Sequence, residues 1–125
     1  MDKEDIIVDG LIETVNSYLK SIKNSDRRKI LKLCYKNPKT ITELQREIGS
    51  NYKWIFEGVK ILEKEKLVRL TKVKGRGSPV YVSSNMTPQD ALLNLGNIID
   101  QFKKELSKKW TRKISNQNLA YFIQS

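Results

Sequence analysis

The sequence has no histidine and a single cysteine, Cys34, among its 125 residues. One thiol cannot close an internal disulfide, so the composition suits a reducing compartment. Zinc sites and histidine-based acid/base catalysis need side chains that the chain does not have. A Gly-rich phosphate loop and a matched pair of carboxylates are also missing. We therefore expect a protein that is not an enzyme and that uses no metal or cofactor.

Long apolar runs are missing too. No stretch approaches the roughly 18 residues of a membrane span, and the acidic opening "MDKEDIIVDG" lacks the basic start of a secretory signal. With 38% hydrophobic and 30% charged residues, the chain is long enough for one domain with a modest core. We expect a cytoplasmic protein with no membrane partner.

Acidic residues are outnumbered by basic ones, and the formal net charge is +10. The excess is concentrated in blocks: residues 26–39 hold six basic side chains and one acidic, 68–84 four basic and none acidic, and 102–125 six basic and one acidic. Basic charge grouped in this way indicates a polyanionic partner such as nucleic acid. A lysine-rich surface that only keeps the protein soluble is the alternative.

Hydrophobic periodicity predicts a mainly α-helical chain with one small β-hairpin. The segments "LVRLTKV" and "PVYVSS" are rich in β-branched residues and flank "KGRGS", as expected for a hairpin with a cationic tip. The last segment, "SNQNLAYFIQS", could be a short helix or a frayed tail. Helices are expected over residues 4–23, 26–36, 41–48, 51–65 and 88–112. Their end signals are Ser25, the Thr40–Glu43 capping box, Gly49, Ser50 and Thr87.

The stretch "TITELQREIGSNYKWIFEGVKILEKEKLVRLTKVKGRGSPVYV" resembles the winged helix-turn-helix domain of ArsR- and MarR-type regulators. The family's "lxxLexxgLv" pattern is similar to "VKILEKEKLVRL", with Leu62, Leu67 and Val68 in its apolar places. Lys66 departs from the pattern, since the family usually has Gly there, and we expect a looser turn into the wing. Small archaeal and archaeal-virus regulators are similar in size and lysine content.

The resemblance implies a winged helix-turn-helix domain over residues 25–84, with a dimerisation helix at 1–24 and a second dimerisation helix and tail at 85–125. It also implies that residues 51–65 form the recognition helix. With Ile55 at the centre of the buried face, a step of about 100° per residue places Lys53, Glu57, Lys60 and Lys64 on the opposite face. Lysine can bind guanine O6 and N7, and a glutamate can accept from the cytosine amino group. A solvated charged face is the alternative.

Three residues of this helix indicate how it packs. For Trp54 we favour partial burial against the first or last helix, and for Phe56 packing rather than base contact. Gly58, in the middle of the helix, predicts a close neighbour, because glycine costs about 1 kcal/mol there relative to alanine. The expected DNA contacts fall into three groups. On the recognition helix they are Ser50, Asn51, Tyr52, Lys53, Trp54, Glu57 and Lys60. The wing set is Lys72, Lys74 and Arg76, and the backbone set is Arg27, Arg28, Lys39 and Thr40.

The outer helices carry apolar stripes at spacings of three and four, which fit helix pairing. In ArsR- and MarR-like proteins such helices pack across a two-fold axis, so the resemblance implies a homodimer. Folding back onto their own domain is the alternative. The expected interface residues are Val8, Ile12, Val15, Leu19, Leu92, Leu95, Ile99, Phe102 and Leu106.

Together these features predict a dimeric, sequence-specific transcriptional regulator of double-stranded DNA, a nucleoid-associated repressor. A non-specific DNA-coating protein and a winged-helix module for protein contact remain alternatives. No sequence feature identifies a small-molecule effector. Cys34 is expected in a helix core; as a redox switch it would have to be exposed or pair between subunits.

Overall fold

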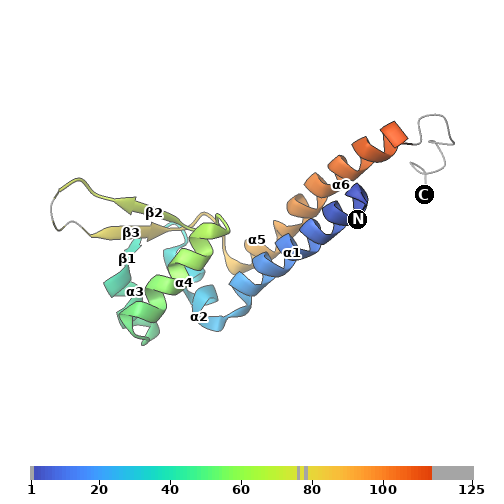
Figure 1. The fold of residues 1–125 in the computed structure, drawn as a ribbon. Coiled ribbons are helices and arrows are strands. Elements are labelled where there is room, and N and C mark those ends of the chain that lie inside the picture. Colours follow the sequence, from blue (N-terminus) through green and yellow to red (C-terminus); the bar gives the residue numbers. More distant parts are fainter. Residues whose placement is uncertain (1, 76, 78, 114–125) are drawn as a thin grey trace. The chain divides into compact units, whose positions relative to one another are not determined.

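The computed structural model describes residues 2–75, 77 and 79–113. These residues fall into two compact units, Asn16–Asn94 and the terminal segments up to Val15 and from Leu95. The predicted tail "SNQNLAYFIQS" lies outside the described residues. The elements, shown in Figure 1, are α1 (Lys3–Lys23), α2 (Ser25–Cys34), β1 (Lys39–Thr40), α3 (Ile41–Ile48), α4 (Tyr52–Lys64), β2 (Arg69–Lys72), β3 (Val80–Ser83), α5 (Pro88–Leu93) and α6 (Leu95–Lys113).

Side-chain caps set the starts of the helices in the 16–94 unit. Thr40 and Glu43 form the predicted capping box at α3, which ends at Gly49 in the left-handed conformation with φ 84°. The two predicted serine caps are wrong by one residue. Asn24, not Ser25, caps α2, and Asn51, not Ser50, caps α4, because each asparagine side chain accepts backbone N–H groups of its helix.

The wing is part of a three-stranded antiparallel sheet with the order β1-β3-β2. β2 and β3 form the predicted hairpin, with Leu70 opposite Val82. The short strand β1, which the sequence analysis did not predict, pairs Lys39 with Val82 on the other side of β3. This pairing ties the start of α3 to the wing, so the base of the hairpin is fixed to the helices.

The core of this unit lies where α2, α3 and α4 meet the inner face of the sheet. Cys34 is fully buried, as expected, and burial raises the pKa of its thiol to about 12. The thiol is therefore protonated and covered at neutral pH, which does not favour a redox switch. In the described part of the chain, no helix is both long and apolar enough to cross a membrane. The buried apolar side chains include Tyr18, Ile22, Ile30, Leu31, Ile41, Leu44, Ile55, Val59, Leu62, Leu67, Val68, Val82 and Ala91.

The single helix predicted over residues 88–112 is wrong, since the structure has two helices with a break at Asn94. Thr87 caps α5 in a capping box with Asp90, as the sequence indicated. The hydroxyl of Tyr18 donates to the carbonyl of Ala91, which would accept the Leu95 N–H in a continuous helix. The segment after Leu93 reads "NLGN", and asparagine and glycine are poor helix formers. Both features favour a break at this point.

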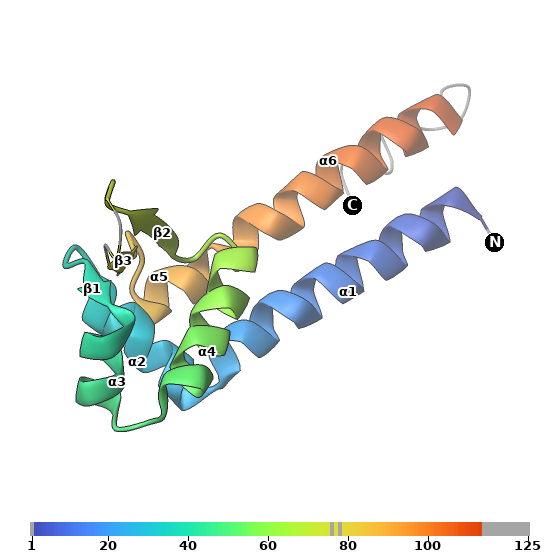
Figure 2. The same ribbon diagram turned by 60° about the vertical axis from the view of Figure 1, so that its left-hand side comes forward.

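In the terminal unit, α6 runs alongside the N-terminal part of α1 in the opposite direction (Figure 2). Apolar side chains on both segments remain open to solvent. Ile6 is 56% exposed, Ile12 52% and Ile99 38%. The apolar stripes on these helices are thus only partly covered by the described residues.

Helix α4 ends in a closed turn in which Lys66 adopts a left-handed conformation, with φ 62°. The Lys66 N–H donates to the carbonyl of Glu63 and the Leu67 N–H to the carbonyl of Leu62, at 2.9 Å each. These two bonds form a Schellman motif, and the buried pair Leu62 and Leu67 supplies its apolar contact. The non-glycine residue therefore leaves the turn closed rather than loose, but it places a Cβ in a conformation that glycine adopts at lower cost.

Candidate nucleic-acid interface

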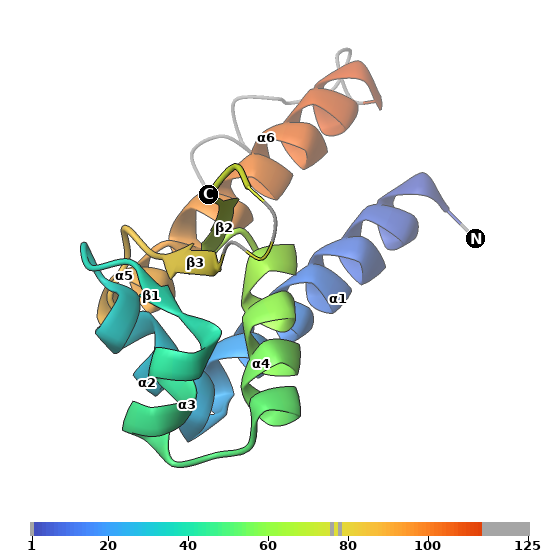
Figure 3. The same ribbon diagram turned by 90° about the vertical axis from the view of Figure 1, so that its left-hand side faces the viewer.

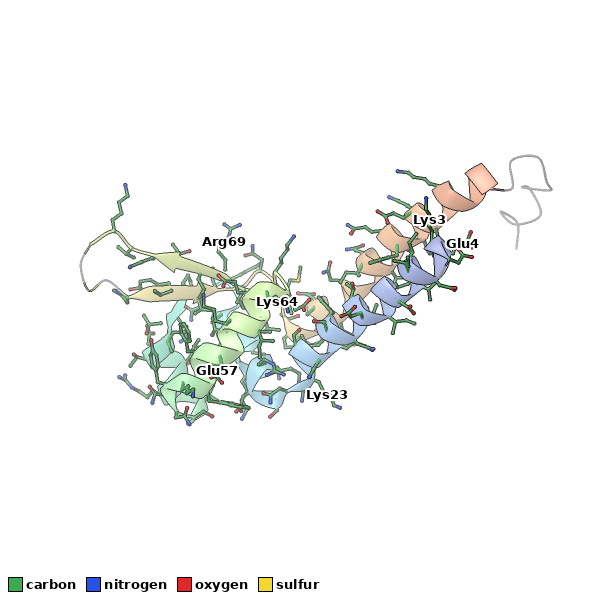
Figure 4. All side chains as sticks on the ribbon, in the orientation of Figure 1. Lys3, Glu4, Lys23, Glu57, Lys64 and Arg69 are labelled. Carbon is green, nitrogen blue, oxygen red and sulfur yellow. The ribbon has the colours of Figure 1, made fainter. Side chains whose placement is uncertain are left out.

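Helix α4 has one buried and one open face. Ile55, Val59 and Leu62 are fully buried. The opposite face carries Lys53, Glu57, Lys60 and Lys64, and all four are exposed. Figure 3 shows α4 beside α2 and α3, and Figure 4 labels Glu57 and Lys64 on the helix. The structure thus places the predicted lysine-bearing face outward, held by the aliphatic face beneath it.

The start of α4 is fixed by three hydrogen bonds. The side chain of Asn51 accepts the Trp54 N–H at 2.8 Å. Ser50, just before it, donates through its hydroxyl to Asp26 at 3.3 Å. The same Asp26 oxygen accepts from the indole N–H of Trp54 at 2.9 Å. Asp26, in the first turn of α2, therefore connects that helix to the front of α4.

Trp54 is partly buried, as expected, and its neighbours in the structure include residues of α2. It is 44% exposed and borders a small pocket between α2 and α4, together with Ile30 and Gly58. The expected close neighbour of Gly58 is present. A Cβ added there would lie 3.4 Å from the side chains of both Arg27 and Ile30. Trp54 and Gly58 thus mark the flank of α4 that faces α2.

The other flank of α4 carries two aromatic rings. Tyr52 and Phe56 are 51% and 40% exposed, and their rings stack with centroids 6.3 Å apart and planes 10° apart. The ammonium group of Lys60 lies 5.7 Å from the centre of the Phe56 ring. Phe56, expected to be a packing residue, is instead part of an exposed aromatic surface. A search for aromatic residues at i and i+4 beside the buried face of the helix would have found the pair.

Two of the four predicted backbone-binding residues make intramolecular bonds. Arg27 donates to the carbonyls of Lys20 and Ser21, at 2.9 and 2.7 Å. Arg28 donates to the carbonyls of Ile22 and Lys23, at 3.1 and 2.7 Å. These are the four C-terminal carbonyls of α1, which no helical N–H can satisfy. A phosphate contact by either arginine would have to compete with these hydrogen bonds.

The other two predicted backbone-binding residues also have partners. Lys39 forms an ion pair with Glu47 at 3.0 Å, and this hydrogen bond raises the pKa of the Lys39 ammonium group. The hydroxyl of Thr40 accepts the Glu43 N–H as the cap of α3. Both residues lie on β1, at the base of the wing.

On the wing, Lys72 and Lys74 are exposed, while Arg76 lies outside the described residues. Arg69, which the sequence analysis did not select, is exposed at the start of β2 and is labelled in Figure 4. Among the charged side chains of the 16–94 unit, two ion pairs are formed within the described residues, Lys39–Glu47 and Lys60–Glu63. Lys53 and Glu57 are therefore not paired with each other.

Within residues 2–75, 77 and 79–113, no cluster of acidic, histidine or cysteine side chains is placed to hold a metal ion.

The predicted dimer residues differ in exposure. Val8, Ile12, Leu92 and Ile99 are exposed. Ile6 and Leu93, which were not predicted, are exposed as well, Leu93 at 77%. The others are half-buried: Val15, Leu19, Leu95, Phe102 and Leu106.

Three helices followed by a β-hairpin, with a short strand completing the sheet, define this domain as a winged helix-turn-helix. Solved structures with the same fold support this assignment. NolR from Sinorhizobium fredii is similar over 80% of this chain and 92% of its own, with a TM-score of 0.58 and 18% identity. The domain of Mb0332 from Mycobacterium bovis, a homodimeric winged helix-turn-helix DNA-binding domain of a possible ArsR-family regulator, is similar over 78% and 85%, with a TM-score of 0.53 and 18% identity.

Reduced HlyU from Vibrio cholerae is similar over 70% of this chain and 90% of its own, with a TM-score of 0.53 and 19% identity. No protein-family model and no curated protein matched the sequence. At these levels of identity, the structural likeness establishes the fold, and the function has to be argued from the residues of this chain.

Proposed function

We propose that the protein is a homodimeric transcriptional repressor that binds specific sites in double-stranded DNA through α4. The observation that carries this proposal is the exposed face of α4 with Lys53, Lys60 and Lys64, anchored by a fully buried opposite face. A helix on a winged domain with such a face has the shape and charge to enter the major groove. The homodimeric DNA-binding domain of Mb0332, with the same fold, supports the proposal.

In this proposal the contacts divide between bases and phosphates. Glu57 and Lys60 read base edges from the middle of α4, and Lys53 reads them from its first turn. Ser50, Asn51, Tyr52 and Trp54 lie in or just before that first turn, close to both bases and phosphates. Lys72, Lys74 and Arg76 on the wing contact the adjacent backbone or minor groove. Lys39 and Thr40 at the base of the wing make the remaining phosphate contacts, and we assign Arg27 and Arg28 a structural role instead.

The dimer is proposed from the apolar side chains that the single chain leaves open. Exposed Val8, Ile12 and Ile99 would cost solvation free energy in a monomer and would be covered by a second copy. Two recognition helices about one DNA turn apart, roughly 34 Å, would then read a palindrome.

The first test is DNA binding by the purified full chain. Sites selected from random double-stranded DNA should share a palindromic sequence, and scrambled competitor should displace the protein at least about 1,000-fold less well than the selected site. If the dimer neutralises about eight phosphates, log K should fall against log salt with a slope of about −7. Equal competition by scrambled DNA would indicate a DNA-coating protein, and no salt dependence would contradict phosphate binding.

The second test is the oligomeric state. Ile12→Asp should convert the protein to a monomer in sedimentation or light-scattering experiments, because a buried carboxylate without a partner is unfavourable. Val73→Asp is the control, because Val73 is 48% exposed but lies on the hairpin. A wild-type chain that is monomeric at micromolar concentration would contradict the dimer.

A further inference from the structure

The stacked pair Tyr52–Phe56 is an exposed feature of α4 that lysine-based DNA binding does not explain. The two side chains lie four residues apart, one turn along the same flank of the helix. They are 51% and 40% exposed, whereas the apolar residues of the buried face of this helix are fully covered. Covering such a pair of rings with apolar groups of a partner would be favourable.

The charges around the pair indicate what kind of partner this is. Lys60 lies over the Phe56 ring, and Lys53 is exposed one residue beyond Tyr52 on the outer face. Apolar rings bordered by lysines fit a surface that presents apolar groups between rows of negative charge. The major groove of DNA is such a surface, and its only apolar group is the C5-methyl of thymine.

Phe56 cannot form a hydrogen bond through its side chain, so it can distinguish bases only by apolar contact. Stacking on Tyr52 restricts the rotation of both rings, so less conformational entropy is lost when they are buried. Four residues of helix span about 6 Å, which is close to two base-pair steps of about 3.4 Å. The two rings can therefore contact methyl groups on adjacent or next-but-one base pairs.

We propose that Phe56 and Tyr52 are specificity-determining residues that read thymine methyl groups in each half-site. This inference rests on the proposed function and narrows it: the half-site contains at least one thymine whose methyl group is needed for tight binding. The lysines of α4 then supply affinity and position, and the aromatic pair supplies selection for a T·A pair at a fixed place.

The experiment replaces thymine with deoxyuridine, which removes the methyl group and leaves every hydrogen-bonding group unchanged. Each thymine of the selected site is replaced in turn, and the dissociation constant is measured with the wild-type chain. We expect a loss of about fourfold at each contacted thymine. In the Phe56→Ala variant the effect should disappear at the thymine that Phe56 contacts, because the ring that contacts that methyl group is absent.

Ile61→Ala is the matched control. The exposed fraction of Ile61, 41%, is nearly that of Phe56, but Ile61 lines the pocket on the flank of α4 that faces α2. This variant should keep the fourfold preference for thymine over deoxyuridine. Because the change is made in the DNA, the wild-type measurement does not depend on how well any variant folds.

The possible failures are distinguishable. If wild-type protein binds its selected site but tolerates deoxyuridine at every position, methyl readout is wrong while the proposed function stands. If Phe56→Ala leaves affinity and thymine preference unchanged, the pair is outside the groove, and a protein partner becomes the better explanation for it. If the chain binds no double-stranded DNA, the proposed function and this inference both fall.

Discussion

Helices α2 and α4 are both rich in basic residues, but the structure uses their charges differently. On α2, Arg27 and Arg28 donate to the last four carbonyls of α1. On α4, Lys53 and Lys64 are exposed and in no ion pair of the described residues. The arginines hold two helices of the protein together, while the lysines remain available for a partner.

The difference shows that a block of positive charge in the sequence is not by itself a binding surface. A guanidinium group near the end of a helix finds unsatisfied carbonyls, and two such groups satisfy a complete helix terminus. The ammonium groups of Lys53 and Lys64 have no backbone carbonyls to bind, because the outer face of a helix presents only side chains. The backbone around a cation therefore decides whether it stabilises the fold or binds a ligand.

The largest expected effect comes from reversing charge on α4. Lys53→Glu with Lys60→Glu should weaken binding to the selected DNA site by at least about 100-fold, since each lost contact is worth roughly 1–3 kcal/mol and repulsion adds to it. The control is Lys29→Glu with Lys32→Glu, which changes the net charge equally on exposed positions of α2. Fluorescence anisotropy measures both. Equal losses would show that only net charge matters.

Truncating Arg27 tests the other half of the comparison. Arg27→Ala should lower the free energy of unfolding by about 2 kcal/mol, because two charged hydrogen bonds to carbonyls are lost. DNA affinity per folded molecule should change little. Lys32→Ala removes the same charge from the same helix and should cost less than about 0.5 kcal/mol. A urea titration measures stability, and an unfolding curve of Arg27→Ala that overlays the wild type would contradict the assignment.

Local sequence signals were enough to predict the part of the site that depends on one helix. Thr40 and Glu43 predicted the start of α3, Gly49 its end, and the spacing of Ile55, Val59 and Leu62 predicted which face of α4 is buried. These features depend on residues within one or two turns of each other, and the sequence contains that information directly.

Features that depend on distant parts of the chain could not be predicted in this way. The roles of Arg27 and Arg28 require the end of α1 to lie beside α2. One feature that favours the break at Asn94 is the bond from Tyr18, which is far away in sequence, to the Ala91 carbonyl. The exposed Phe56 was misassigned because an aromatic residue is usually buried, and the sequence did not show how far the core extends around α4.

Asp26 is the link between the two helices, and its loss should have a smaller effect. Asp26→Ala removes the acceptor for Ser50 and for the Trp54 indole, and it removes a favourable charge from the first turn of α2. We expect about 1 kcal/mol of lost stability. In a Trp110→Phe background, which leaves Trp54 as the only tryptophan, the fluorescence should become more quenchable. Asp90→Ala is the control, because it removes a first-turn carboxylate that caps α5. It shows how much stability is lost when only a helix cap is removed. Unchanged Trp54 quenching would show that Asp26 does not hold the indole.

The smallest effect concerns how the two helices end, since α2 and α4 are each followed by a lysine with positive φ, Lys36 at 52° and Lys66 at 62°. Lys66→Gly should raise the free energy of unfolding by about 0.5–1 kcal/mol, because the strain of a left-handed Cβ is relieved and exceeds the added entropy of the unfolded chain. Lys64→Gly, two residues earlier within α4, should instead lose about 1 kcal/mol. Thermal or urea unfolding of the pair measures the difference in sign. If both variants are destabilised, the left-handed turn at Lys66 is not strained, and the departure from glycine at this position has no cost for the fold.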